Sequence, residues 1–352
     1  MSTPGEPPGP AQTRGPDRTD HESGQHAPLP VAEVAHLGGA VLAEVSTAVV
    51  GMHRPLRVAL ATILAGGHVL FEDVPGLGKT LAARCLAQAL GLDFSRLQCT
   101  PDLLPADITG SYAYDPNAAE FTFRPGPVFT GLFLADEINR TAPKTQSALL
   151  EAMAERQVTV EGTSFTLPAP FHVLATSNPV EYEGTYPLPE AQLDRFMVRL
   201  AVGHPDAQAE VDVLTRRIAR RTEHASVAQV VTSETVLGMQ AGVEAIEVDP
   251  DVLRYCVDLA ASTRAHPAVE VGASPRGSQA LVLVARGLAV LDGRDFVTPE
   301  DVKEVAVAAL AHRLTLTPGA WASGTTPIEV VSALLEEVPG PATAGASSTA
   351  RS

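Results

Sequence analysis

Apolar residues follow a helical spacing over residues 31–65 and then change period. Pro55 is compatible with the first turn of a second helix, and Gly66-Gly67 closes that helix. Residues 68–73 form a short apolar run that ends at a Pro-Gly turn, and residues 81–90 return to helical spacing. This order predicts a strand, a loop and a helix.

Three further short apolar runs, at residues 131–135, 171–176 and 196–202, predict buried strands. Strands separated by helix-like stretches indicate an α/β fold with a mostly parallel sheet flanked by helices. Two hairpins are predicted between them: residues 120–129 around an Arg-Pro-Gly turn, and residues 158–167 around Glu161-Gly162. The pattern alone leaves open whether the hairpins cover sheet edges or carry function.

The strand pattern ends at His204-Pro205, and the later segments have helical spacing with recognisable starts at Asp249-Pro250, Ser274-Pro275 and Thr298-Pro299. We therefore expect an α/β core over residues 31–203 and a small all-α lid domain over residues 204–338. Residues 1–30 and 339–352 are rich in Pro and Gly and poor in apolar residues, so both are expected to be disordered.

Composition narrows the function classes. The 352 residues carry 25 basic and 41 acidic side chains, a net charge of −16, which disfavours nucleic-acid binding. The three cysteines are too few for a disulfide framework or a zinc knuckle and are interpreted as core thiols in a reducing compartment. There is no apolar run of membrane-spanning length and no signal-peptide pattern, so a cytoplasmic location is expected.

The loop after the first strand has the composition of a phosphate-binding Walker A loop, in the strand-loop-helix context that this loop requires. In this interpretation Lys79 reaches the β and γ phosphates of a nucleotide, and the Thr80 hydroxyl binds Mg²⁺. Asp73 stands where the pattern has its first glycine, which could place a carboxylate near the phosphates. A glycine-rich turn without a ligand is the alternative. The residues assigned to nucleotide binding are Val74, Pro75, Gly76, Leu77, Gly78, Lys79, Thr80 and Leu81.

Two acids, Asp136 and Glu137, follow the apolar run 131–135 and should lie at the carboxyl end of a buried strand, where ligands bind in open α/β sheets. Asp136 is the candidate to hold Mg²⁺ through water, and Glu137 is the candidate base for the attacking water. Solvated acids at a strand end are the alternative.

At this point the chain resembles the MoxR family of AAA+ ATPases, near the magnesium-chelatase ATPase subunits, over about residues 31–335. The resemblance rests on three runs: AGGHVLFEDVPGLGKT at 65–80, DEINRTAPKTQ at 136–146, and EGTYPLPEAQLDRF at 183–196. The family also varies at the position of Asp73.

The resemblance implies further site residues. Asn178 resembles a sensor 1 amide that touches the γ-phosphate, although an Asn before Pro often only turns the chain. Arg276 resembles a sensor 2 arginine that reaches the same nucleotide from the lid; a surface arginine is the alternative. Val50 and Gly51 resemble an adenine contact, while a helix-ending glycine is the competing interpretation.

Arg195 resembles an arginine finger that acts on the ATP of a neighbouring subunit. The alternative is an arginine paired with Asp194 or Glu190 at a helix end. The hairpins resemble the helix 2 insert and the pre-sensor 1 hairpin of this clade. Four arginines on one later helix could meet an acidic neighbour or could simply be solvated: Arg216, Arg217, Arg220 and Arg221.

The resemblance implies a Mg²⁺-dependent, ATP-hydrolysing ring of six copies that remodels or matures a client protein, often with a von Willebrand factor A domain partner and sometimes for metal insertion. A nucleotide-gated regulatory scaffold with slow hydrolysis is the main alternative. A nucleic-acid translocase is a third possibility, disfavoured by the acidic charge and the 5% aromatic content.

Overall fold

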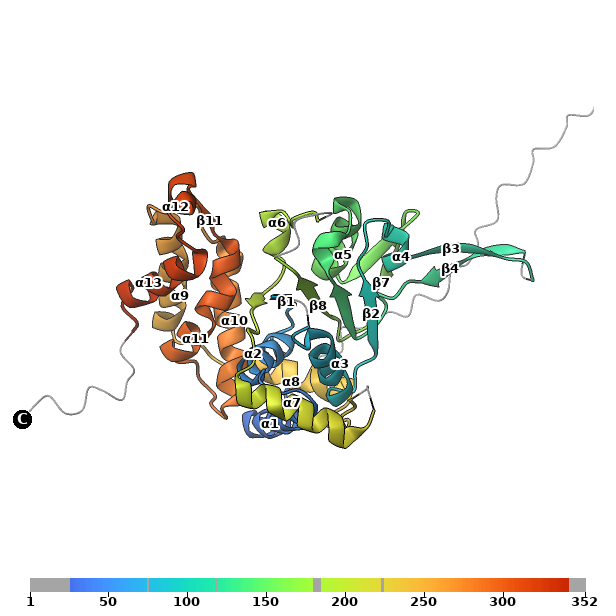
Figure 1. Ribbon diagram of the computed structural model, residues 1–352, viewed down its shortest axis with the longest axis horizontal. Helices are drawn as coiled ribbons and strands as arrows, with labels where there is room; N and C mark the ends of the chain where they lie inside the picture. Colours follow the sequence, from blue (N-terminus) through green and yellow to red (C-terminus); the bar gives the residue numbers. More distant parts are fainter. Residues whose placement is uncertain (1–25, 75, 118, 180–184, 223–224, 342–352) are drawn as a thin grey trace, which may run out of the picture.

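The computed structural model describes residues 26–74, 76–117, 119–179, 185–222 and 225–341. Within them, a parallel five-stranded sheet lies at the centre (Figure 1). Its order is β2 (Phe94–Gln98), β5 (Leu132–Asp136), β8 (His172–Ser177), β1 (Val69–Glu72) and β9 (Val198–Leu200). The expected α/β fold is confirmed, and four of these strands match the predicted runs. The sequence interpretation missed β2, because this edge strand alternates half-buried and exposed residues instead of forming an apolar run.

Alternate residues of each central strand enter different hydrophobic clusters on the two faces of the sheet. Val69 and Phe71 join one cluster, whereas Leu70 joins the other. Helices α1 (Val31–Ala48), α2 (His53–Leu64) and α3 (Lys79–Ala89) contribute to the first cluster, and α4 (Pro105–Thr109) and α5 (Pro143–Glu155) contribute to the second. The sheet is therefore covered on both faces, which is why its central strands β5 and β8 are buried along their whole length.

One predicted hairpin is correct and the other is misplaced. β6 (Gln157–Val160) and β7 (Thr163–Thr166) pair around Glu161-Gly162, as expected. In contrast, β4 (Glu120–Pro125) pairs with the preceding β3 (Gly110–Asp115), so the Arg-Pro-Gly sequence ends this hairpin instead of turning it. The sequence pattern does not predict β3, because polar and apolar residues are mixed along this strand. This hairpin projects far from the sheet (Figure 1).

The later part of the described chain is mostly helical, with the predicted starts. Ser274 caps its helix through a bond to the Arg276 N–H, and Thr298 forms a capping box with Asp301. A short antiparallel pair of β10 (Val269–Val271) with β11 (Thr315–Leu316) corrects the expectation that no strand follows residue 205. The helical elements of the described chain that are not yet named are α6 (Glu190–Leu193), α7 (Ala207–Arg220), α8 (Ser233–Glu244), α9 (Pro250–Ala265), α10 (Pro275–Leu291), α11 (Pro299–Leu310), α12 (Pro318–Ala322), α13 (Pro327–Glu337), the earlier 3₁₀ turn η1 (Ile138–Arg140) and the later 3₁₀ turn η2 (Ala311–Arg313).

The core is continuous across the predicted domain boundary. Helix α10 packs against both α1 and α2, and α8 packs against the same two helices. Residues 26–30, at the end of the arm that we expect to be disordered, are described, and there the Leu29 N–H donates to the Gly238 carbonyl at 3.1 Å. Most of that arm and of the C-terminal tail lies outside the described residues, so the boundaries of all four segments stay predictions.

The three cysteines are buried, as interpreted from the sequence. Burial raises the pKa of Cys99 and of Cys256 to about 12, so these thiols stay protonated and unreactive at neutral pH. Among the described residues, no helix is long and apolar enough to cross a membrane.

Candidate nucleotide-binding site

The loop between β1 and α3 has the backbone of a phosphate-binding loop. Gly76 and Gly78 have φ values of 85° and 78°, in the left-handed region that favours glycine. Gly78 is also the N-cap of α3, so the free N–H groups of the first helical turn face the loop. The loop glycines are therefore required by conformation. Pro75 lies outside the described residues.

Lys79 begins α3 and is 8% exposed. Its Nζ donates to the carbonyl oxygens of Asp73 at 2.6 Å and of Val74 at 3.3 Å. Burial lowers the pKa of Lys79, while the nearby carboxylates of Asp73 and Asp136 oppose this shift. The ammonium group thus lies at the loop, within reach of a phosphate bound there.

Thr80 and Asp136 are brought together as predicted, because the Thr80 Oγ1 donates to the Asp136 Oδ2 at 3.2 Å. Hydroxyl and carboxylate oxygens are the donors that Mg²⁺ prefers, so this pair fits the ion. The carboxylate has a further partner that the sequence did not reveal: Arg96 on β2 forms an ion pair with the Asp136 Oδ2 at 2.7 Å. Arg96 was missed because its strand was missed.

Glu137 follows β5 in a left-handed conformation with φ of 57°. The Thr176 Oγ1 accepts from the Glu137 N–H at 2.8 Å and donates to the Asp136 Oδ1 at 2.6 Å, which fixes both acids to β8. The Glu137 Oε2 accepts from the Gln98 Nε2 at 2.8 Å and from the Arg140 Nη1 at 3.0 Å. The position of this carboxylate is therefore defined by one donor from β2 and one from the turn that follows β5.

Asn178 follows β8 and is 4% exposed. Its carbonyl accepts from the Asn139 Nδ2 at 3.1 Å, a contact that the sequence interpretation did not assign. A pocket of about 210 Å³ is lined by Gly76, Leu77, Gly78, Lys79, Thr80, Arg96, Gln98, Asp136, Glu137, Thr176, Ser177 and Asn178. The residues predicted to bind phosphate, to hold the metal, to act as the base and to serve as sensor 1 thus all line this pocket.

Val50 and Gly51 lie on the other side of the same loop. They line a cavity of about 560 Å³ together with Gly76, Leu77, Gly78 and Leu81. Helix α7 closes this cavity with residues that the sequence interpretation did not assign to a site, including Val213 and Leu214. The rest of the lining includes Glu210 and the arginines of α7, so the cavity is largely apolar with charged groups at α7. A largely apolar cavity that shares the phosphate loop is suited to a nucleobase. In the described structure, Arg216 on α7 donates to the carbonyls of Ser46 and Thr47, whereas an acidic neighbour had been considered.

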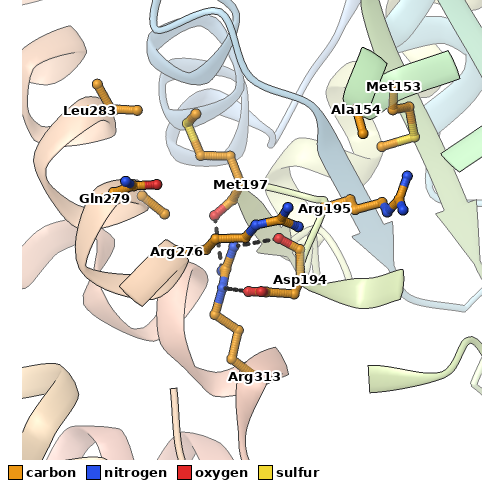
Figure 2. A pocket seen from close by; sticks show the side chains of 10 residues that line it. Met153, Ala154, Asp194, Arg195, Met197, Arg276, Gln279, Leu283 and Arg313 are labelled. Carbon is orange, nitrogen blue, oxygen red and sulfur yellow. Dashed lines mark hydrogen bonds and ion pairs between the residues drawn. The ribbon is translucent and has the colours of Figure 1, made fainter. Parts of the chain in front are cut away.

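Arg195 and Arg276 line a different pocket, of about 220 Å³, with Arg313 (Figure 2). Neither is among the residues that line the pocket of the phosphate loop. The structure therefore does not bring Arg276 to the nucleotide loop of its own chain, because the start of α10 packs beside Asp194. This placement differs from the expectation of a contact within one chain.

The acid next to Arg195 is engaged elsewhere. The Asp194 Oδ1 accepts from the Arg313 Nε at 2.7 Å, and its Oδ2 accepts from the Ser274 Oγ at 3.0 Å. Arg195 points away from this group toward Met153 and Ala154 (Figure 2). Its Nη1 donates to the Leu150 carbonyl. Among the ion pairs of the described residues Arg195 has none, which argues against the interpretation of Arg195 as half of a helix-end ion pair.

Comparison with known proteins agrees with this site. Residues 68–198 match the model of the ATPase family associated with various cellular activities (AAA), and residues 261–334 match an AAA lid domain. Relatives include YeaC of Bacillus subtilis, an uncharacterized protein, at 46% identity over 85% of this chain and 93% of that protein. Chaperone MoxR1 of Mycobacterium tuberculosis is 41% identical over 87% of this chain and 83% of its own.

A crystal structure from Cytophaga hutchinsonii, of a protein assigned as an ATPase, superposes with a TM-score of 0.82 at 39% identity, covering 89% of this chain and 97% of that one. The similarity extends over both the sheet and the helical part. The chain belongs to the MoxR family of AAA ATPases.

Proposed function

We propose that this ATPase hydrolyses Mg²⁺-ATP at a site that a neighbouring copy completes, and that it uses the cycle to remodel a client protein. The convergence of Lys79, Thr80, Asp136, Glu137 and Asn178 in one pocket carries the proposal. In this arrangement Lys79 supplies a cation for the phosphates, and Thr80 and Asp136 supply oxygens that can bind a metal. Glu137 supplies a general base, and Asn178 supplies an amide.

Each side chain has a distinct task. Thr80 and Asp136 are the residues that would hold Mg²⁺, which neutralises phosphate charge when it is bound. Glu137 accepts the proton of the attacking water, and the donors from Gln98 and Arg140 hold its carboxylate in position. Asn178 offers a neutral amide beside the Glu137 carboxylate. The largely apolar cavity at Val50 and Gly51 binds the nucleobase.

Arg195 and Arg276 serve the nucleotide of the next subunit in this proposal. Both line one pocket away from the phosphate loop, and a guanidinium group binds phosphate oxygens well. A closed ring places the arginine pocket of one copy against the phosphate loop of the next, and a head-to-tail interface of this kind repeats around the ring. We propose six copies, on the basis of the family resemblance.

The remodelling role rests on the name of the relative MoxR1, which is a chaperone, and on the family resemblance. A protein with a von Willebrand factor A domain is the proposed partner, and client maturation by metal insertion is one proposed form of the activity. The hairpin β3–β4 carries the exposed side chains of Tyr114 and Phe121, which offer an apolar contact to a client or a neighbour.

A pull-down tests the remodelling role. The Glu137→Gln protein, loaded with ATP, should retain the von Willebrand factor A domain partner and the client, whereas the Lys79→Ala protein should not. ATP turnover that rises on adding the captured client supports remodelling. Turnover that stays slow and unaffected by the client supports the regulatory scaffold. Recovery of nucleic acid alone, with salt-dependent DNA binding, supports a translocase.

A further inference from the structure

Asp73 makes contacts that a residue at the first glycine position of a phosphate loop does not need. Its Oδ2 accepts from the N–H groups of Val202 at 2.8 Å and of Gly203 at 2.6 Å, and its Oδ1 accepts from the Val74 N–H at 2.8 Å. The carboxylate therefore points to residues that follow β9. The sequence had suggested that it could lie near the phosphates, but its bonds are made to this other segment.

The contact lies where the sheet ends. The pairing of β1 with β9 stops at Phe71 and Leu200, and the Asp73 carboxylate accepts from the N–H groups two and three residues beyond Leu200. Gly203 then turns the chain, with φ of 72°, toward α7. Bonds from N–H groups to a carboxylate are stronger than bonds between neutral groups. Asp73 thus fixes the direction in which the connector, residues 201–206, leaves the core.

The main chain of Asp73 is bonded to Lys79 and to the end of β8. Its carbonyl accepts from the Lys79 Nζ at 2.6 Å, and its N–H donates to the Ser177 carbonyl at 3.2 Å, one residue before Asn178. Val202 and Gly203 also line the cavity proposed for the nucleobase, together with Gly76 and Gly78 of the loop. Asp73 is therefore bonded to Lys79 of the phosphate loop, to the end of β8 beside Asn178, and to the connector that leads to α7.

We propose that Asp73 is a positioning residue that couples the phosphate loop to the connector and, through it, to α7. The proposal rests on the proposed function. Because the carboxylate is bonded to both the loop and the connector, a shift of either one changes the geometry of the other. An alanine at this position leaves the loop glycines, Lys79 and Thr80 unchanged in the sequence. It removes the link and also one carboxylate near the Lys79 ammonium group, a charge that Asp73→Asn removes as well.

Hydrogen exchange on the intact protein measures the link directly. Val202 is half-buried and Gly203 is exposed, so their amide protection depends on the carboxylate. In Asp73→Ala these two amides should exchange about 10- to 150-fold faster, the range expected for loss of a hydrogen bond to a charged group. Asp73→Asn keeps one acceptor oxygen and should restore part of the protection. Asp206→Ala is the matched control, since Asp206 caps α7 in the same connector through the Ala209 N–H but does not touch the loop.

Kinetics then test the coupling. Asp73→Ala should bind a fluorescent ATP analogue nearly as well as the wild-type protein, with kcat lowered several-fold and KM little changed. Asp249→Ala, which removes the analogous cap of α9 outside the connector, should keep both constants. A non-hydrolysable ATP analogue should change the exchange of Val202 and Gly203 in the wild-type protein but not in Asp73→Ala. Equal exchange in the two proteins, an unchanged kcat, or a loss of nucleotide binding in Asp73→Ala would each overturn the coupling. If wild-type protein neither binds nor hydrolyses ATP, the proposed function fails instead.

Discussion

Arg313 of the C-terminal helical part forms an ion pair with Asp194, the residue directly before Arg195, with 2.7 Å between the Arg313 Nε and the Asp194 Oδ1. The Arg313 Nη2 also donates to the carbonyls of Asp194 and Phe196. Burial lowers the pKa of Arg313, and Asp194 opposes that shift. Because Asp194 is engaged by Arg313, it does not pair with Arg195, which points toward Met153 and Ala154.

Breaking this pair should destabilise the protein. Asp194→Asn leaves the Arg313 guanidinium buried without its counter-charge, which should lower the free energy of unfolding by on the order of 3 kcal/mol. Urea unfolding measures the change. Asp258→Asn is the control: its pair with Arg254 is exposed, and its loss should cost less than about 1 kcal/mol. Equal losses of unfolding free energy in the two variants would show that the buried Arg313–Asp194 pair stabilises the fold no more than an exposed pair does.

Lys79→Ala should abolish nucleotide binding, because it removes the main cation from a loop that gathers several phosphate charges. Titration with a fluorescent ATP analogue checks this. Lys144→Ala, on α5 and away from the loop, serves as the control and should bind normally. Unchanged affinity in Lys79→Ala would refute the assignment of the phosphate loop.

Glu137→Gln should bind ATP normally and hydrolyse it about 10²- to 10⁴-fold more slowly, since the amide keeps the shape but accepts no proton. Single-turnover hydrolysis measures the chemical step. Glu151→Gln changes an exposed carboxylate on α5 and should leave the rate unaltered. Turnover within about tenfold of the wild-type rate in Glu137→Gln would exclude Glu137 as the base.

Two buried histidines should make the fold sensitive to acid. His68 accepts from the Val173 N–H, and His172 contacts the Gly67 carbonyl and Gln240, so both rings are held between hydrogen-bond partners. Burial lowers the pKa of His68 to about 3 and that of His172 to about 4, from an ordinary value of 6.5. Since the folded pKa is depressed, the unfolded chain binds the protons first as the pH falls below 6.5.

The free energy of unfolding should therefore be at its full value above pH 6.5 and should fall by up to about 1.4 kcal/mol per pH unit for each histidine below it. The loss should level off near pH 4 for His172 and near pH 3 for His68. Urea unfolding between pH 7 and pH 5 measures this slope. The slope should be smaller in His172→Gln, and an identical slope in this variant would contradict the assignment.

Much of the fold could be predicted because the central strands are buried on both faces and so appear as apolar runs. The edge strand β2 could not, since Ser95 and Arg96 break its pattern, and the strand β3 was hidden for the same reason. The loop, acid and sensor residues could be proposed from the sequence because each follows a strand that the sequence reveals, and the structure brings them to one pocket. Their partners Arg96, Gln98 and Thr176 were not, because contacts across strands depend on register.

The position of Arg276 shows the limit of a local motif. The Ser-Pro start of α10 was recognised, but the packing of this helix beside Asp194 follows from the bonds of Ser274 and Arg313, which are far apart in the chain. The role of Asp73 was hidden in the same way, because Val202 and Gly203 lie 129 and 130 residues further on.

The central claim is that the arginine pocket of one copy completes the nucleotide site of the next, and Arg195 tests it best. An arginine finger is worth roughly 10³- to 10⁵-fold in turnover, so Arg195→Ala should be nearly inactive while still binding ATP. Arg254→Ala removes an exposed arginine from the helical part and should keep normal turnover.

The decisive measurement is ATP turnover of mixed Arg195→Ala and Lys79→Ala subunits. Each variant should be inactive alone, and mixing should restore hydrolysis at interfaces where an intact Lys79 loop faces an intact Arg195. Near-normal turnover in pure Arg195→Ala assemblies, or no recovery on mixing, would contradict a site completed by the neighbouring copy.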